Sequence, residues 1–150
     1  MPADPRLVAF LEQHGAETAG HSDEGLLAHL LGTHALLEGF GARPALCTAG
    51  LIHSVYGTES YRGKLLPIDL RPQVQALAGV EAEQVAFQFG AMEKESLYAN
   101  LDRADRFTLR SRFTGEIWDL TEGEFADLCD LTVANWLEQR ERVAPEHRFH

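Results

Sequence analysis

The sequence has few cysteines and few basic residues, and both shortages narrow the classes of protein to which it can belong. Two cysteines, Cys47 and Cys129, lie far apart in the 150 residues and show no zinc-ribbon spacing. We expect both to be buried thiols, because a free cysteine commonly behaves as a small core residue. Thirteen Lys and Arg against 23 Asp and Glu give a net charge of −10, with the acids spread along the chain. A general nucleic-acid surface is therefore disfavoured.

Long apolar runs are also missing. No stretch approaches the length of a membrane span, and residues 1–6 lack the basic and apolar segments of a signal peptide. We therefore expect a cytoplasmic protein without membrane partners. The chain has no repeat or low-complexity tract, and 45% of its residues are hydrophobic, so we expect residues 1–150 to form a single domain.

What the sequence does contain is a series of helical patterns. The spacing of apolar residues predicts helices over 7–13, 22–40, 44–56, 72–77, 80–92, 93–101 and 121–142, with Ser22 capping the second. Alternating residues around Thr114 and Gly115 predict a small hairpin within 107–120. Thr121 and Glu124 have the spacing of a capping box for the last helix. The sequence therefore predicts an all-α bundle with a minor β-hairpin.

Two of the predicted helices are apolar on nearly every side, yet each carries a histidine. His29 lies in the segment 25–34, and His53 lies in the run Ala-Gly-Leu-Ile-His-Ser at 49–54. A helix that is apolar all round is a central one, and polar groups buried in it need partners. Imidazoles from two core helices can form a metal pocket. His34 lies five residues after His29, which directs it elsewhere on the helix, so we expect it to be structural.

The two histidine segments resemble the HD-domain superfamily of helical metal-dependent enzymes, most closely its guanosine tetraphosphate hydrolase branch. In that branch the helix with the first histidine ends near Leu-Gly, and the next helix carries Ala-x-Leu-Leu-His-Asp, similar to 37–41 and 49–54 here. Phe-Gly at 89–90 and Ala-Asn-Trp-Leu at 134–137 extend the resemblance, which covers roughly residues 21–140. The continuation Val-Tyr-Gly-Thr-Glu at 55–59 is also similar to a less characterised bacterial HD-like group.

The sequence departs from this family at two metal ligands. The aspartate that follows the family's histidine is Ser54 here, and the late aspartate falls on Asn135. A hard divalent cation therefore loses its main charge compensation. The resemblance thus implies His29 and His53 as metal ligands, and leaves Ser54 and Asn135 as site residues with either a catalytic or a structural role.

Other residues could complete the site. His21 precedes His29 by two helical turns, and Glu59 follows the second histidine helix as a further ligand or the general base. Tyr56 could position a substrate, and Arg62 and Lys64 could hold an anionic group. Such a histidine-rich set suits a divalent transition metal (Fe, Mn or Zn) better than magnesium.

We therefore expect a metal-dependent enzyme that acts on a small, anionic substrate, most simply a hydrolase. Two alternatives remain open at this point. The first is a ligand-binding or regulatory module without turnover on a degenerate HD scaffold, which the missing aspartates favour. The second is an iron-dependent oxygenase, because related HD-like proteins include oxygenases. A homodimer is compatible with each of these.

Overall fold

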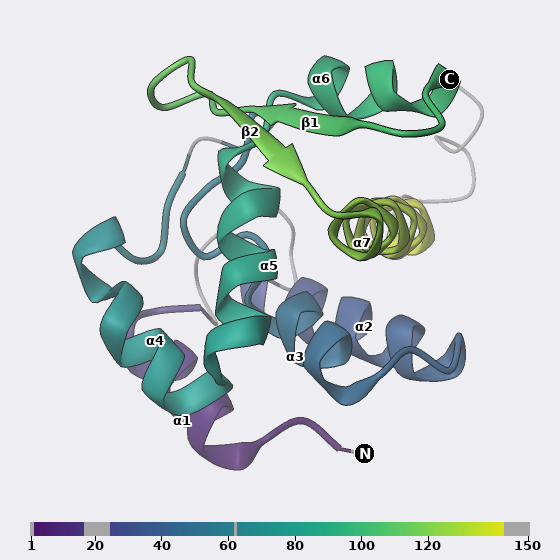
Figure 1. Ribbon diagram of the computed structural model, residues 1–150. Helices are drawn as coiled ribbons and strands as arrows, with labels where there is room; N and C mark the ends of the chain where they lie inside the picture. The colour runs from purple at the N-terminus through teal and green to yellow at the C-terminus, as the bar shows by residue number, and fades with distance from the viewer. Residues whose placement is uncertain (1, 17–24, 62, 143–150) are drawn as a thin grey trace.

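The computed structural model describes residues 2–16, 25–61 and 63–142, and these form an all-α bundle with one small hairpin (Figure 1). The elements in chain order are α1 (Pro5–Gln13), α2 (Gly25–Gly39), α3 (Pro44–Ile52), a 3₁₀ turn (Ile68–Leu70), α4 (Arg71–Ala78), α5 (Val80–Ala91), α6 (Lys94–Tyr98), a second 3₁₀ turn (Ala99–Asp102), β1 (Phe107–Arg110), β2 (Ile117–Leu120) and α7 (Glu122–Arg142). The predicted fold class is thereby confirmed.

The centre of the bundle is built from α2, α3, α5 and α7. Helix α2 packs against both α3 and α7, and α5 packs against α3 and α7. The hairpin and α6 lie across one end of α5, while α1 and α4 lie toward the other end (Figure 1). The antiparallel register pairs Phe107 with Leu120 and Arg110 with Ile117.

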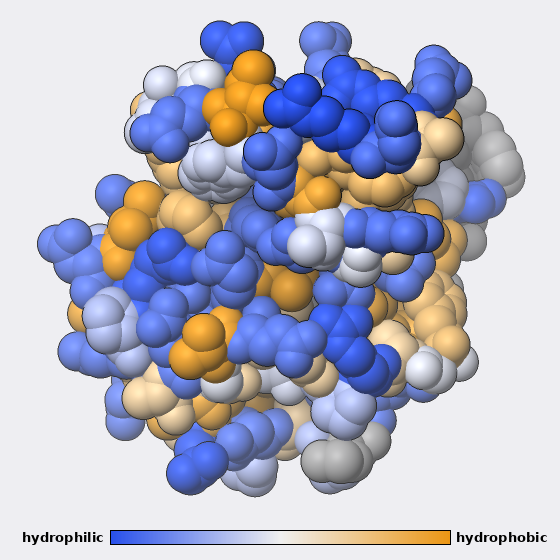
Figure 2. All heavy atoms as spheres, viewed as in Figure 1, coloured by the Kyte–Doolittle hydropathy of each residue, from blue (hydrophilic) through white to orange (hydrophobic). Residues whose placement is uncertain are grey.

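Two apolar clusters fill the interior. One joins α2, α3, α5, α7 and the hairpin around Leu37, Phe89 and Leu131. The other joins α1, α2, α3 and α4 around Leu11 and Ile52. The outer face in Figure 2 is mostly hydrophilic with small scattered apolar groups, as the charge of the chain requires. Among the described helices, none is both long enough and apolar enough to cross a bilayer.

Two of the predicted helices differ clearly from the observed ones, whereas the other described helix ends lie within about two residues of the prediction. The third helix ends at Ile52 instead of residue 56, and a turn follows that Gly57 closes with φ +80°. The predicted helix 93–101 is divided, because Asn100 donates its side-chain amide to the carbonyls of Ser96, Leu97 and Thr108 and so ties the 3₁₀ turn to β1. The predicted Ser22 cap lies outside the described residues.

The expectation that both cysteines are buried is confirmed for Cys47 and wrong for Cys129. Cys47 and Cys129 are free thiols, the first buried and the second half-buried. His34 Nδ1 lies 3.0 Å from a carboxylate oxygen of Glu38 one helical turn later. Burial lowers the pKa of His34, although the Glu38 carboxylate opposes this effect.

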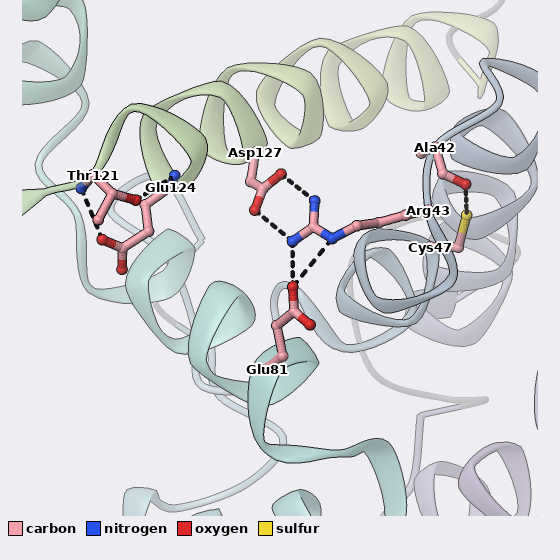
Figure 3. A network of polar contacts seen from close by, with 7 residues as sticks. All are labelled: Ala42, Arg43, Cys47, Glu81, Thr121, Glu124 and Asp127. Atoms are coloured by element: carbon pink, nitrogen blue, oxygen red, sulfur yellow. Dashed lines mark hydrogen bonds and ion pairs between the residues drawn. The ribbon is translucent and has the colours of Figure 1, made fainter.

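A single arginine joins the starts of three helices (Figure 3). The Arg43 guanidinium donates to both carboxylate oxygens of Asp127 on α7, at 2.6 and 2.8 Å, and to Glu81 on α5. These two carboxylates raise the pKa of Arg43. Because Arg43 precedes α3, this contact holds α3, α5 and α7 together at the end where α7 begins.

The first turn of α7 contains the predicted capping box. The Thr121 hydroxyl accepts the backbone N–H of Glu124 at 3.0 Å, and the Glu124 carboxylate accepts the N–H of Thr121 at 2.9 Å (Figure 3). We expect Thr121→Ala to lower the free energy of unfolding by about 1 kcal/mol, because it leaves a helical N–H without its acceptor. Urea denaturation measures the change. Thr121→Ser keeps the acceptor and should retain most of the stability; an equal loss in both variants would contradict the role of the cap.

Candidate metal centre

Side chains from three helical segments meet at one point in the bundle. His29 comes from α2, His53 caps the end of α3, and Asn135 comes from α7. The two Nε2 atoms lie 3.1 Å apart, and Asn135 Oδ1 lies 2.9 Å from His29 Nε2 and 3.0 Å from His53 Nε2. Ligands bound at about 2.1 Å on one face of an octahedral metal ion lie about 3.0 Å apart. The three donor atoms therefore fit one transition-metal ion.

The partners of the other ring nitrogens orient both lone pairs toward this point. His53 Nδ1 donates to the carbonyl oxygen of Gly50 at 2.7 Å. His29 Nδ1 lies 2.5 Å from Glu138 Oε1. A neutral imidazole that donates through Nδ1 has its lone pair on Nε2. A carboxylate or carbonyl behind a histidine is the arrangement that fixes ring orientation at metal sites.

Burial keeps His53 uncharged. The side chain is 1% exposed, and the Phe89 ring stands edge-on to it with 5.2 Å between ring centroids. Desolvation, together with the neighbouring His29, lowers the pKa of His53 to about 4, although bonds to Gly50 and Asn135 oppose the shift. His53 is therefore a neutral, ligand-competent imidazole at pH 7.

This depressed pKa predicts a dependence of stability on pH in chelator-treated protein. The unfolded chain takes up a proton on His53 below about pH 6.5, whereas the folded chain does so only near pH 4. The free energy of unfolding should therefore fall by about 2 kcal/mol more between pH 7 and pH 5 than in His53→Gln. Urea denaturation at the two pH values measures the difference. Parallel losses in the two proteins would contradict a buried neutral His53.

The Glu138 carboxylate can reach His29 because α2 has no side chain at position 32. A Cβ atom on Gly32 would lie 2.6 Å from Glu138 Oε2 and less than 3.0 Å from two carbons of the same side chain. Both His29 and Glu138 are about nine-tenths buried, so their contact is shielded from solvent. Gly32 therefore makes the room in which Glu138 orients His29.

A cavity of about 330 Å³ opens beside the three donor atoms. His29, Ser54 and Asn135 contribute polar side chains to its wall. Its apolar residues are Leu26, Phe89 and Met92, and its remaining lining residues are Gly25, Thr58, Glu59, Ser60, Tyr61, Lys94 and Gln139. A volume at the lower end of the range for small-molecule pockets suits a ligand of modest size.

The match to a known family covers most of this cavity. A family model described as a domain of unknown function, DUF6817, matches residues 10–94, which is more than half of the chain. The chain belongs to the DUF6817 family. The matched DUF6817 segment contains His29, His53 and the cavity wall from Phe89 to Lys94, and it ends before α7. No curated protein and no solved structure matches the chain.

The DUF6817 chain brings four of the predicted site residues around the cavity. His29, Ser54, Glu59 and Asn135 all line it, and His53 reaches its edge through the contacts with His29 and Asn135. Within residues 2–16, 25–61 and 63–142, no three His, Cys, Asp or Glu side chains cluster closely enough to hold a metal ion. The third atom that meets the two Nε2 atoms belongs to the amide of Asn135, a residue type outside these four.

Other predicted residues lie elsewhere. Tyr56 is not among the cavity residues, and its hydroxyl donates to Glu83 at 2.8 Å in a separate buried network. Lys64 is exposed on the loop. The predicted ligand His21 and the basic residue Arg62 lie outside the described residues.

Glu59 has a structural contact in addition to its place in the cavity. Its Oε1 atom accepts the backbone N–H of Lys94 at 3.0 Å, which ties the loop to the start of α6. Lys94 Nζ donates to the Ser60 hydroxyl at 2.6 Å, so these three residues form one polar edge of the cavity.

Sequence reasoning missed Glu138 and the wall residue Met92. Glu138 lies three residues after Asn135, a spacing that places both on one face of α7. A carboxylate one turn from a candidate ligand was therefore a usable signal. Met92 carried no comparable signal, because its place depends on the turn from α5 into α6.

Proposed function

We propose that this DUF6817 chain is a metal-dependent hydrolase that acts on a small anionic molecule in the cavity. The observation that carries the proposal is the convergence of His29 Nε2, His53 Nε2 and Asn135 Oδ1 within 3.1 Å of one another. Two imidazoles and one amide oxygen favour a divalent transition metal such as Fe, Mn or Zn. We take its site of action to be the cytoplasm.

The charge of the donor set supports an anionic substrate. Histidine binds a metal ion as a neutral imidazole and asparagine through a neutral amide oxygen, so the three donors would bring no charge. The Glu138 carboxylate lies behind His29 on the Nδ1 side. A bound divalent ion polarises a substrate oxygen and lowers the pKa of a coordinated water. Because none of the three proposed ligands is negatively charged, they would not neutralise the positive charge of the ion. That charge could then attract an anionic group of the substrate.

Glu59 is our proposed proton acceptor. It is the only carboxylate among the described cavity residues, and the Lys94 N–H fixes one of its oxygens. Hydrolysis requires that the attacking water lose a proton and that the leaving group gain one, and a positioned carboxylate can do both in turn. Glu59→Gln should therefore lower turnover without removing the donor atoms.

The order of the donor residues supports the HD-like resemblance as part of the proposal. The first histidine lies on α2, the second follows at the end of α3, and the residue at the family's late aspartate position lies on α7 beside both.

A binding module without turnover is the second candidate, and Asn135 favours it. The family's two aspartate positions hold the neutral residues Ser54 and Asn135 here. A metal ion would gain no charge compensation from either of them, whereas the cavity itself remains able to bind a ligand. The two functions differ in metal content, which can be measured directly.

The decisive experiment is elemental analysis of tag-free protein beside its His29→Ala and His53→Ala variants. We expect one metal ion per wild-type chain and none in either variant, with folding verified by circular dichroism. His34→Ala, on α2 but paired with Glu38, should retain the metal. Absence of metal from wild-type protein, even after reconstitution with Fe, Mn or Zn, would leave the binding module.

A further inference from the structure

Two polar groups in the cavity wall have hydrogen-bonding capacity that no described residue uses. Ser54 is 4% exposed, and its Oγ atom has no hydrogen-bond partner among the described residues. Asn135 Oδ1 faces the histidine cluster, 2.9 Å from His29 Nε2 and 3.0 Å from His53 Nε2, while no described contact involves its Nδ2 atom. Both residues line the same cavity. A buried hydroxyl is expected to have a partner, and a ligand in the cavity can supply it.

The unused groups are donors, so the complementary ligand presents acceptors. A Ser hydroxyl donates one proton and an amide nitrogen donates two. Two acceptor oxygens on one ligand head, as in a carboxylate, would serve Ser54 and Asn135 together. Lys94 is the only cation among the described cavity residues, and its Nζ already donates to Ser60. Because the Glu59 carboxylate lines the same wall and offsets the charge of Lys94, the wall suits a singly charged head better than a doubly charged one.

The apolar part of the cavity wall determines the character of the ligand beyond its charged head. Leu26, Phe89 and Met92 are each less than one-tenth exposed, and they line the cavity together with the polar groups. Phe89 stands edge-on to the His53 ring, so this part of the wall packs directly against the histidine cluster. An apolar ligand body of about the size of a phenyl ring removes this surface from water.

We propose that the cavity binds a small monocarboxylic acid with an apolar body, its carboxylate held by Ser54 and Asn135. The inference rests on the proposed function in that the same cavity is the site of reaction. The proposed function specifies only a small anionic substrate. The inference adds that this ligand has one negative charge and an apolar body.

The test is isothermal titration of chelator-treated protein with benzoate, which needs no bound metal. Benzoate should bind with one-to-one stoichiometry and at least about tenfold more tightly than acetate, which lacks the body, or benzyl alcohol, which lacks the charge. Phenyl phosphate should also bind more weakly than benzoate. Ser54→Ala should weaken benzoate binding about tenfold, the effect of one lost hydrogen bond.

The matched control is Thr48→Ala, which removes a hydroxyl from α3 in a separate groove with His34 and Glu38 and should leave binding unchanged. The inference is overturned if benzoate does not saturate, if benzyl alcohol or phenyl phosphate binds as tightly, or if Ser54→Ala binds like wild type. The metal content of the untreated protein reports separately on the proposed function: if untreated protein contains no metal, even after reconstitution, while the chain binds benzoate, the hydrolase is removed and the carboxylate site is kept.

Discussion

Gly32→Ala is expected to weaken metal binding by about 10- to 100-fold, although residue 32 touches no proposed ligand atom. The added Cβ would lie 2.6 Å from Glu138 Oε2, so the carboxylate must move away from His29. His29 then loses the partner that assigns its Nδ1 proton and aims its Nε2 atom at the cluster. Titration of chelator-treated protein with Zn²⁺ measures the affinity.

The same helix provides the control for this prediction. A Cβ on Gly39 would meet no atom within 4 Å, so Gly39→Ala adds the same methyl group to α2 without displacing anything. It should leave the affinity unchanged, and any gain of helix stability from replacing glycine is common to both variants. Glu138→Gln should weaken binding in the same direction as Gly32→Ala. Equal affinity of the two glycine variants would show that Glu138 does not orient His29.

Glu83→Ala is expected to lower the free energy of unfolding by about 3 to 5 kcal/mol, the largest stability effect that we predict. The Glu83 side chain is fully buried, and it accepts hydrogen bonds from Arg71, Gln75 and Tyr56. Burial alone would raise the pKa of Glu83, but these donors outweigh it and lower the pKa. Removal of the carboxylate leaves the Arg71 charge and the Tyr56 hydroxyl without their acceptor.

Urea denaturation at pH 7 measures this loss, and the adjacent residue provides the control. Gln84 contacts the same Arg71 from an exposed position, so Gln84→Ala should change stability by less than about 0.5 kcal/mol. A Glu83→Ala protein as stable as Gln84→Ala would show that the network contributes little. The carboxylate is retained at neutral pH, so its stabilising effect should decline as pH falls through its lowered folded-state pKa.

Local sequence patterns predicted most of the fold because the relevant interactions are short in range. The Thr121 and Glu124 capping box lies within one helical turn, and the alternating hairpin residues lie on both sides of the short connection 111–116. The end of α3 was predicted four residues too late. His53 is buried in a turn by its contacts with Phe89 on α5 and Asn135 on α7. The apolar residues at 51–55 give no information about these distant contacts, so the local pattern predicted a longer helix.

The candidate site was predictable only in part, for the same reason. His29, His53 and Asn135 were identified by their resemblance to a motif, and the structure brings them together. Tyr56 lies next to the site in sequence, but its side chain joins the Glu83 network on the opposite side of the turn. The role of Gly32 depends on a carboxylate 106 positions later in the chain.

The position of α7 across the cluster gives a bound ion a mechanical role. His53 and Asn135 are separated by 82 positions, and the intervening chain forms α4, α5, α6 and the hairpin. An ion held by both ends would close this segment into a loop and tie α7 to the end of α3 in the folded chain. At its other end α7 is held by Arg43. Release of the ion would therefore free the far half of α7 first, so that local opening of this helix, and with it entry to the cavity, would be governed by metal occupancy.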